Sequence, residues 1–479
     1  MSFSGFTFLF LFLPLALALN FLLPKRWRNA TALLSSLLFY AWISGGQIIF
    51  LLVFILVNDR LGRWIRAHAG QPLPARRRTV AAVAFNLAIL VFYKLAALPW
   101  VAPAVLRQPA WFQELARYPI GISFLTFLAI AYLIDTYRRR IPGEVSLFSL
   151  SLYLALFPKV IAGPLMRYGE FAPQLEHRLV TVSAAADGAR RFILGLARKV
   201  LVADLLAVLV NQVFAVEGLR LPPGLAWLGI VAFSLQIYHD FAGYSDMAIG
   251  LGLMLGFRFP ENFNLPYTSL SITEFWRRWH ISLSNWFRDY VFYPLERFRR
   301  SGSGYPQALN TLAVFLLTGL WHGLTPNFLI WGGIHGTAIA LEQGRPGARL
   351  RSLGRLWQYC YALAVIMLGW VFFRSGSLAG ALHYLASLVG VYRSLPAFPL
   401  SVMPPVPLST WLALLVGAFF ALPVFPWLVG RLENGLPHRL VSSRLAWRLL
   451  ADAGLLLLFV LAVMQMAGST YQGYIYAQF

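Results

Sequence analysis

Apolar residues recur in long runs along almost the whole chain, from Phe3 to Met466. Some runs reach the ~20 residues that an α-helix needs to cross the hydrocarbon core of a bilayer, and others fall short of it. Short runs in such a chain are typical of broken, re-entrant or interfacial helices. The pattern predicts an all-α, polytopic membrane protein with about ten to twelve membrane segments. The expected segments are Phe3–Leu23, Leu33–Val57, Val80–Leu98, Tyr118–Ile134, Leu147–Ile161, Phe192–Val213, Leu225–Leu255, Leu309–Leu341, Trp357–Phe373, Leu378–Val391, Trp411–Val429 and Leu449–Met466.

Basic residues are concentrated in the short loops between these runs. Arg76–Arg78 and Arg138–Arg140 are separated by two expected spans, so we expect both clusters on the same side of the membrane. An excess of Lys and Arg in short loops marks the cytoplasmic side. Lys25 also lies on this side if Leu33–Val57 enters and returns as two short helices hinged at Gly45 and Gly46.

A different pattern runs from Ile272 to Tyr290, where apolar positions follow the 3.6-residue period of one long amphipathic helix. Trp, Tyr and Arg on one helix suit the boundary between lipid headgroups and acyl chains. His280 lies near the border of the two faces. The expected apolar face consists of Ile272, Phe275, Trp276, Trp279, Leu283, Trp286, Phe287 and Tyr290. The expected polar face consists of Glu274, Arg277, Arg278, Asn285, Arg288 and Asp289.

Composition agrees with a membrane protein and excludes several other classes. The chain has 479 residues, of which 59% are hydrophobic, and its mean hydropathy is +0.65, far above that of a soluble domain. Its net charge of +22 would indicate nucleic-acid binding in a soluble protein, but clustering in loops indicates anionic lipid headgroups instead. Cys360 is the single cysteine, which excludes an internal disulfide and a cysteine-based metal cluster. We expect no separate soluble domain, no nucleic-acid partner and no bound metal.

The strongest functional candidate is His322. It lies near the middle of the Leu309–Leu341 run, which contains no Asp, Lys or Arg. Ionisable residues inside membrane segments usually carry function, although a histidine can also serve as a hydrogen-bonded packing residue between helices. As a general base, a neutral imidazole takes a proton from a hydroxyl nucleophile. Gly319 and Gly332 would let another backbone or a ligand approach closely.

The other histidines are weaker candidates. His280 either orients His322, lines a substrate path, or is an interfacial polar residue. His335 and His239 are each surrounded by apolar residues, so packing or a helix–helix hydrogen bond is the favoured interpretation.

Acidic residues within apolar runs also need a physical reason. Asp240 and Asp246 flank the sequence FAGYS, and a carboxylate buried in lipid requires a partner or a wet cavity. A salt bridge to an arginine is the structural alternative for Asp246. The chain has no Walker A motif and no G-x-S-x-G elbow, which excludes those two catalytic arrangements.

The end of the chain, YQGYIYAQF, is rich in tyrosine. The phenol of Tyr476 is a candidate acyl acceptor if the tail reaches a catalytic cavity. The alternative is an aromatic anchor at the membrane interface.

Long stretches between Tyr118 and His335 resemble a known family. These are YPIGISFLTFLAIAYLIDTYR, FPKVIAGPLMRY, SLQIYHDFAGYSDMAIGLGLMLGFRFPENFNLPY, SITEFWRRWHISLSNWFRDYVFYPL and LTGLWHG. Together they are similar to the membrane-bound O-acyltransferase (MBOAT) family, in the branch of bacterial alginate O-acetyltransferases. Peptidoglycan and cellulose acetylation proteins and D-alanyl-teichoic-acid transferases are its relatives.

The resemblance implies helices around a tunnel in a single membrane-embedded domain over residues 1–479, with a motif-rich core at 118–342 and the tail at 471–479. It implies that His322 is the signature histidine, His280 the second functional histidine, and Tyr476 the acyl-relay tyrosine. Candidates for lining the tunnel or the substrate site are Asp246, Tyr244, Trp276, Arg277, Trp321 and Asn285.

The implied activity is O-acetylation of an envelope polysaccharide from the bacterial inner membrane. The expected donor is cytoplasmic acetyl-CoA or another acyl thioester, with no bound cofactor, and a periplasmic O-acetyltransferase is the expected partner protein. Alginate is the expected polymer, with peptidoglycan or cellulose as alternatives. A polysaccharide or lipid transporter without covalent chemistry is the hypothesis from another class, because basic loops and broken helices also suit it.

Overall fold

The computed structural model describes residues 2–68, 70–98, 101–109, 112–113, 116–141, 143–178, 180–216, 221–303, 306–391, 405–424 and 443–468. Over these residues every regular element is a helix, as the apolar pattern predicts. The chain divides into two compact units. Unit 1 contains Met1–Phe192 and Ser245–Glu261, and unit 2 contains Ile193–Tyr244 and, from Asn262 on, the remaining described residues. The expectation of one domain over residues 1–479 stays a prediction.

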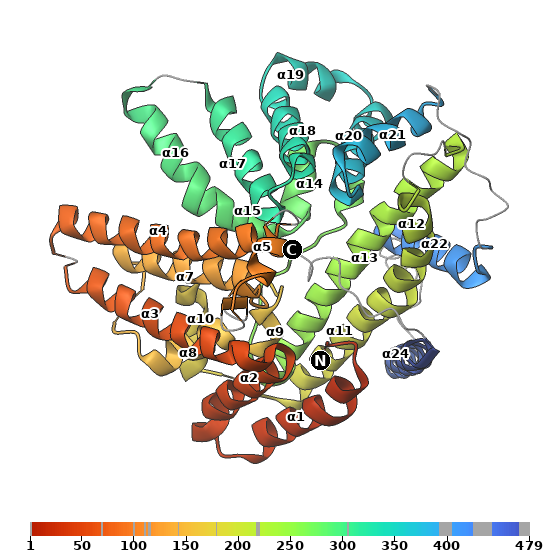
Figure 1. Ribbon diagram of the computed structural model, residues 1–479. Coiled ribbons are helices and arrows are strands. Elements are labelled where there is room, and N and C mark those ends of the chain that lie inside the picture. The colour runs from red at the N-terminus through yellow and green to blue at the C-terminus, as the bar shows by residue number, and fades with distance from the viewer. Residues whose placement is uncertain are drawn as a thin grey trace. The chain divides into compact units, whose positions relative to one another are not determined.

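Unit 1 is built from the N-terminal helices (Figure 1). Its short 3₁₀ or π segments are η1 (Phe8–Phe12), η2 (Lys25–Trp27) and η3 (Gly45–Gln47). Its α-helices are α1 (Leu13–Leu22), α2 (Arg28–Ser44), α3 (Ile48–Arg66), α4 (Pro72–Ala96), α5 (Ala102–Leu106), α7 (Ile122–Tyr137), α8 (Leu147–Ala155), α9 (Phe157–Val160) and α10 (Tyr168–Glu176). Helix α11 (Val182–Ala197) begins in unit 1, and α13 (Pro223–Leu255) ends in it.

The predicted hinge in unit 1 is confirmed. Helix α2 ends at Ser44, and Gly45 adopts a positive φ of 58° before α3 begins at Ile48. Glycine pays little steric cost at positive φ, which explains why the apolar run bends at this position.

The two arginine clusters of unit 1 lie beside the same end of α3. Arg78 contacts His68 and lies 4.9 Å over the ring of Trp64, and the Arg66 guanidinium donates to the carbonyl of Gly143 just beyond Arg138–Arg140. Helices α3, α4 and α7 lie side by side (Figure 1). Both clusters therefore lie near one end of α3 within this unit, and the side of the membrane on which they lie stays a prediction.

Unit 2 holds the remaining helices. Its short 3₁₀ or π segments are η4 (Arg198–Ala203), η5 (Pro266–Thr268), η6 (Arg288–Phe292) and η7 (Arg299–Ser303). Its α-helices are α12 (Asp204–Phe214), α14 (Ile272–Arg278), α15 (Ile281–Phe287), α16 (Tyr293–Phe298), α17 (Gln307–His322), α18 (Pro326–Glu342), α19 (Arg345–Ser352), α20 (Arg355–Arg374), α21 (Leu378–Leu388), α22 (Leu408–Ala421) and α24 (Ser443–Gly468).

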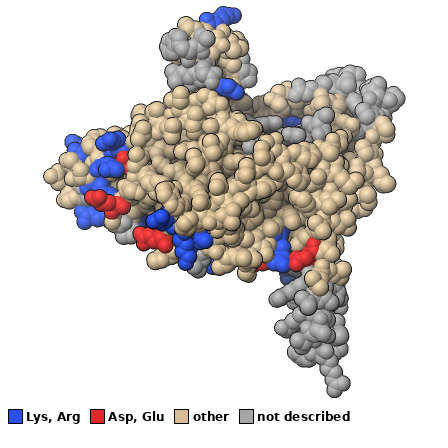
Figure 2. Space-filling model, turned by 90° about the horizontal axis from the view of Figure 1, so that it is seen from below, with Lys and Arg blue, Asp and Glu red and all other residues tan. Residues whose placement is uncertain are grey.

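The described helices include several that suit a membrane. By length and composition, Lys25–Arg66, Pro72–Ala96, Pro223–Leu255, Arg355–Arg374 and Leu449–Gly468 are long and apolar enough to cross it. Shorter apolar helices are Phe8–Leu22, Ile122–Tyr137, Leu378–Leu388 and Leu408–Ala421. Figure 2 shows a face on which uncharged side chains cover most of the surface and charged side chains gather in small groups. This is the surface expected of a multi-pass membrane protein.

The prediction of one helix from Ile272 to Tyr290 is wrong. Helix α14 ends at Arg278, and His280 takes a left-handed conformation (φ 43°, ψ 53°) before α15 begins at Ile281. A non-glycine residue in this region cannot continue a right-handed helix. The expected apolar face is nevertheless buried throughout, so the pattern predicted burial correctly and helical continuity incorrectly.

The apolar run Leu309–Leu341 is also two helices rather than one. Helix α17 ends at His322, Gly323 is extended, and α18 begins at Pro326. The two helices pack against each other closely (Figure 1). A Cβ atom on Gly319 would lie 2.3 Å from the carbonyl oxygen of Phe328, and one on Gly332 would lie 2.3 Å from that of Phe315. The two glycines therefore permit the close backbone approach that the sequence predicts.

A buried ion-pair network lies within unit 2. The Lys199 ammonium is 2.7 Å from a carboxylate oxygen of Asp204 and 2.7 Å from one of Asp240, and all three side chains are buried. Lys199 is the partner that the buried carboxylate of Asp240 requires.

The glycine packing predicts a stability difference between neighbouring glycines. Gly319→Ala forces the α17 and α18 backbones apart and is expected to lower the free energy of unfolding by about 1–3 kcal/mol. Gly333→Ala is the matched control, because a Cβ at Gly333 meets nothing within 4 Å. Thermal unfolding in detergent measures both variants, and equal melting temperatures would contradict the close-packing interpretation.

Candidate functional site

His322 is the last residue of α17 and lies in an aromatic cage in unit 2. Its ring centroid is 4.4 Å from that of Trp321, 5.0 Å from Trp331, 5.0 Å from Phe373 and 6.1 Å from Phe328. Only 4% of the residue is exposed. The position suits a base that is shielded from water.

Helix α18 connects this cage to α14. On α18, Trp331 packs against His322, and one turn further on His335 accepts a hydrogen bond at Nδ1 from the Trp276 indole (3.3 Å). Because Nδ1 accepts, the His335 proton lies on Nε2. The predicted helix–helix hydrogen bond of His335 is thus confirmed. His239, the other weak candidate, lies within 2.9 Å of the carbonyl oxygen of Gly417 through its Nε2.

His280 is held by one asparagine. The Oδ1 atom of Asn262 accepts from the backbone N–H of Ser282 (3.2 Å) and from its hydroxyl (2.9 Å), and lies 3.1 Å from Nδ1 of His280. An amide oxygen can only accept a hydrogen bond, so the His280 proton is assigned to Nδ1, which donates to it. Nε2 is then the basic nitrogen of His280. The Asn262 carbonyl accepts from the Ile281 N–H at 2.9 Å. This asparagine therefore sets both the chain reversal and the tautomer.

His280 is electrically neutral at physiological pH. Burial lowers the pKa of its imidazole to about 3, because the surrounding rings cannot solvate a charge. Its ring lies edge-on to Phe241, at a centroid distance of 4.6 Å. Aromatic contacts from the adjacent Trp279 run to Trp370, then Phe373, and finally His322.

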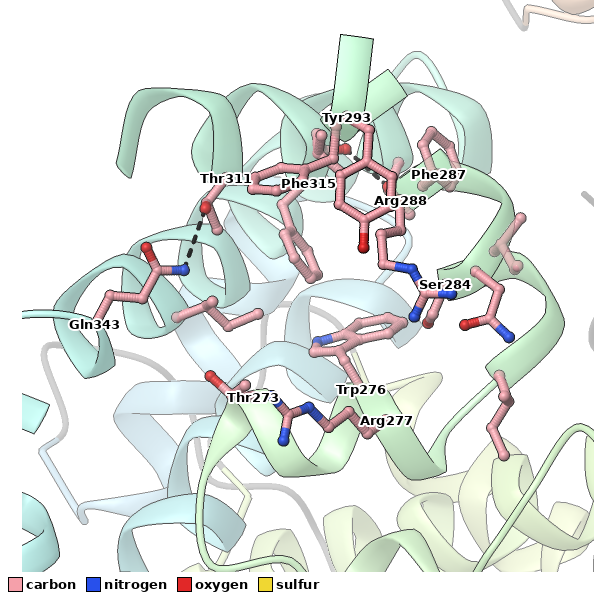
Figure 3. Close-up of a pocket in the computed structure, with 17 residues that line it drawn as sticks. Thr273, Trp276, Arg277, Ser284, Phe287, Arg288, Tyr293, Thr311, Phe315 and Gln343 are labelled. Atoms are coloured by element: carbon pink, nitrogen blue, oxygen red, sulfur yellow. Dashed lines mark hydrogen bonds between the residues drawn. The ribbon is translucent and has the colours of Figure 1, made fainter. Parts of the chain in front are cut away.

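A pocket of about 510 Å³ lies next to this region (Figure 3). Its walls come from α14, α15, η6, α16, α17 and α18, and Figure 3 shows the Trp276 indole projecting into its middle. Arg277 and Arg288 supply cationic groups, and Arg288 is 3.4 Å from the Asp289 carboxylate. The apolar walls and two guanidinium groups suit a ligand with an apolar part and an anionic part.

His322 itself does not line the pocket, but one aromatic layer separates them. Thr318, one turn before His322 on α17, lines the pocket. Trp276 lines it as well and lies 5.7 Å from Trp331, whose ring contacts His322.

Trp276, Arg277 and Asn285 line the pocket, and Trp321 contacts the His322 ring. The sequence missed two others. Arg288, which lines the pocket, was assigned only to a helix face. Asn262, which holds His280, looks like an ordinary loop asparagine.

The remaining candidates lie elsewhere. Asp246 accepts from Nε of Arg191 at 2.6 Å, and Arg191 also binds Glu261 at 2.6 Å, all within unit 1. This is the salt-bridge alternative for Asp246. Tyr244 is buried on α13 and does not line the pocket. Tyr476 lies outside the described residues, as does most of the loop from Leu395 to Pro407.

The family model of MBOAT, membrane-bound O-acyltransferase family, matches residues 34–373. The chain therefore belongs to this family and is a multi-pass O-acyltransferase of the bacterial inner membrane.

Individual relatives agree with this assignment. The chain is 42% identical over 388 residues to a probable alginate O-acetylase AlgI of Pseudomonas aeruginosa, covering 79% of this chain and 73% of the relative. It is 38% identical to the probable alginate O-acetylase AlgI of Pseudomonas putida over the full length of both chains. A peptidoglycan O-acetyltransferase of Helicobacter pylori is 32% identical, covering 78% of this chain and 75% of the relative.

The Asn262 contacts predict a large effect of a small substitution. Asn262→Ala leaves the buried Ser282 groups and His280 Nδ1 without this acceptor, and is expected to cost roughly 2–4 kcal/mol of unfolding free energy. Thermal unfolding in detergent is the measurement. Asn264→Ala is the control, because Asn264 is exposed and its known hydrogen bonds use only its backbone. A melting temperature of Asn262→Ala equal to that of the control would disprove the role of this amide.

Proposed function

We propose that this enzyme transfers an acetyl group from cytoplasmic acetyl-CoA, or another acyl thioester, across the membrane for O-acetylation of an exopolysaccharide. Alginate is the proposed polymer, because two of the relatives above carry the name alginate O-acetylase. Peptidoglycan is the second candidate, supported by the Helicobacter pylori relative. Cellulose stays a prediction from the sequence resemblance alone.

The observation that carries the proposal is the position of His322, at the carbonyl end of α17 and one aromatic layer from the pocket. The thioester donor would occupy the pocket with its phosphates near Arg277 and Arg288 and its acyl end toward Trp276. The acyl group then reaches His322 past the contact between Trp276 and Trp331.

The transfer is an ordinary acyl exchange. His322 removes the proton from an acceptor hydroxyl, whose oxygen attacks the thioester carbonyl carbon. The C–S bond breaks, the proton passes to the leaving thiolate, and the products are an ester and a thiol. The acceptor hydroxyl is that of Tyr476 or of a partner molecule, and a periplasmic O-acetyltransferase would complete the transfer to the polysaccharide. His280, neutral and fixed by Asn262, would keep the aromatic layer in place beside the path.

Replacing His322 tests the proposed base. His322→Ala is expected to lower the turnover rate by at least 10²-fold, the typical contribution of a general base, while the protein still folds. The measurement is acetyl transfer from radiolabelled acetyl-CoA by purified protein, with melting temperature as the folding check. His383→Ala, at an exposed histidine of α21, is the matched control. Unchanged acetyl transfer in His322→Ala would refute the assignment.

The pocket arginines make a separate prediction about the donor. Arg288→Gln removes a charge that would face the donor phosphates, and is expected to raise the KM for acetyl-CoA about tenfold. The KM for acetyl-pantetheine, which has no phosphate, should stay unchanged. Arg297→Gln is the control, because Arg297 is exposed and does not line the pocket. Equal changes for both donors would place the phosphates elsewhere.

A further inference from the structure

Glu342, at the end of α18, binds the beginning of α14. Its two carboxylate oxygens accept from the backbone N–H of Ile272 (2.6 Å) and of Thr273 (2.8 Å), and one also accepts from the Thr273 hydroxyl (2.5 Å). The side chain is buried, with 7% of the residue exposed. A carboxylate at the first turn of a helix satisfies N–H groups that have no partner within the helix.

This contact matters because α14 is short. It has only seven residues, and an isolated helix of that length is not stable in water, so its position depends on what holds its ends. Three of its residues, Thr273, Trp276 and Arg277, line the pocket. Whatever fixes α14 also fixes this wall.

A second contact joins the same two helices. Trp276 donates to His335, which lies seven positions before Glu342 on α18 (342 minus 335). Seven positions are two helical turns, so His335 and Glu342 share one face of α18. Trp331, one turn before His335, carries the contact to His322. One face of α18 therefore links the wall of the pocket to the candidate base.

We propose that Glu342 is a positioning residue, whose carboxylate fixes α14 on α18 and so holds Trp276 and Arg277 in register with His322. The inference rests on the proposed binding of the acyl donor in this pocket. No substitution at this position reproduces both contacts. Glutamine offers one acceptor oxygen and turns an N–H₂ group toward the second N–H, and aspartate keeps the charge but is one methylene too short.

Kinetics of the full-length enzyme provide the first test. Glu342→Gln and Glu342→Asp are both expected to raise the KM for acetyl-CoA about tenfold and to change kcat less than threefold. An unchanged KM in both variants would overturn the proposal. The matched control is Asp204→Asn, which removes a buried carboxylate of unit 2 that binds Lys199 and does not touch the pocket. This control is expected to lower the melting temperature without raising KM. If Asp204→Asn raises KM as much as the Glu342 variants do, the role of Glu342 is purely structural.

A double-mutant cycle tests the contact itself. Thr273→Val removes one of the three donors and is expected to raise KM two- to fourfold in the native background and not at all in Glu342→Gln. Multiplicative effects in the double variant would show that Glu342 does not act through Thr273.

A third measurement does not depend on activity. Because Cys360 is the single cysteine, Cys360→Ser gives a background in which Arg277→Cys is the only thiol. Adding Glu342→Gln is expected to change the rate of maleimide labelling at this position at least threefold, and an unchanged rate would overturn the proposal. A changed labelling rate with an unchanged KM would support the positioning of α14 and refute the pocket as the donor site.

Discussion

Backbone groups at the ends of broken helices must find hydrogen-bond partners inside the protein, because hydrocarbon offers none. The region around the candidate site depends on this constraint. The chain interrupts its apolar segments at His280 and again between His322 and Pro326; His280 and His322 are buried, whereas Gly323 to Thr325 are half-buried and Pro326 is exposed. Side chains supply the missing partners. The amide oxygen of Asn262 accepts from a backbone N–H at the beginning of α15, and the carboxylate of Glu342 accepts from one at the beginning of α14. At the beginnings of α14 and α15, these polar side chains take the place of water.

The same constraint explains the distribution of charge. Inside unit 2, Lys199 lies between two carboxylates, and in unit 1, Arg191 lies between Asp246 and Glu261. The Lys199 network is buried, whereas in the Arg191 network Asp246 is buried and Arg191 and Glu261 are partly exposed; in both, one cation is matched by two carboxylates. Arg277 and Arg288 differ from these groups because they line a cavity that a ligand can enter, and Arg288 does so while it lies 3.4 Å from the Asp289 carboxylate. Lining a cavity is what makes these two charges candidates for binding.

Much of the fold could be predicted from hydrophobicity, and the places where prediction failed have a common cause. The prediction that the apolar face from Ile272 to Tyr290 is buried was correct, because burial follows from which residues are apolar. The prediction of one continuous helix was wrong, because the break at His280 depends on Asn262. That contact spans 18 residues of sequence, so the 3.6-residue period cannot reveal it. The run Leu309–Leu341 likewise hid a turn, since Gly323 and Pro326 are the only local signs of it. The hinge at Gly45, by contrast, was visible because two adjacent glycines in an apolar run usually mark a break in the helix.

The spacing of the two polar contacts along the chain has a consequence for biogenesis. Asn262 precedes the groups it binds by 18 to 20 residues, whereas Glu342 follows its partners by about 70. Chains fold from the N-terminus as they emerge from the ribosome. The turn at His280 can therefore form soon after translation of its own segment, but α14, although capped locally by Ser271, lacks its contact with Glu342 until α18 has been made. A nascent chain truncated before Glu342 would therefore have the turn at His280 already formed, while α14 would not yet be held by the Glu342 carboxylate.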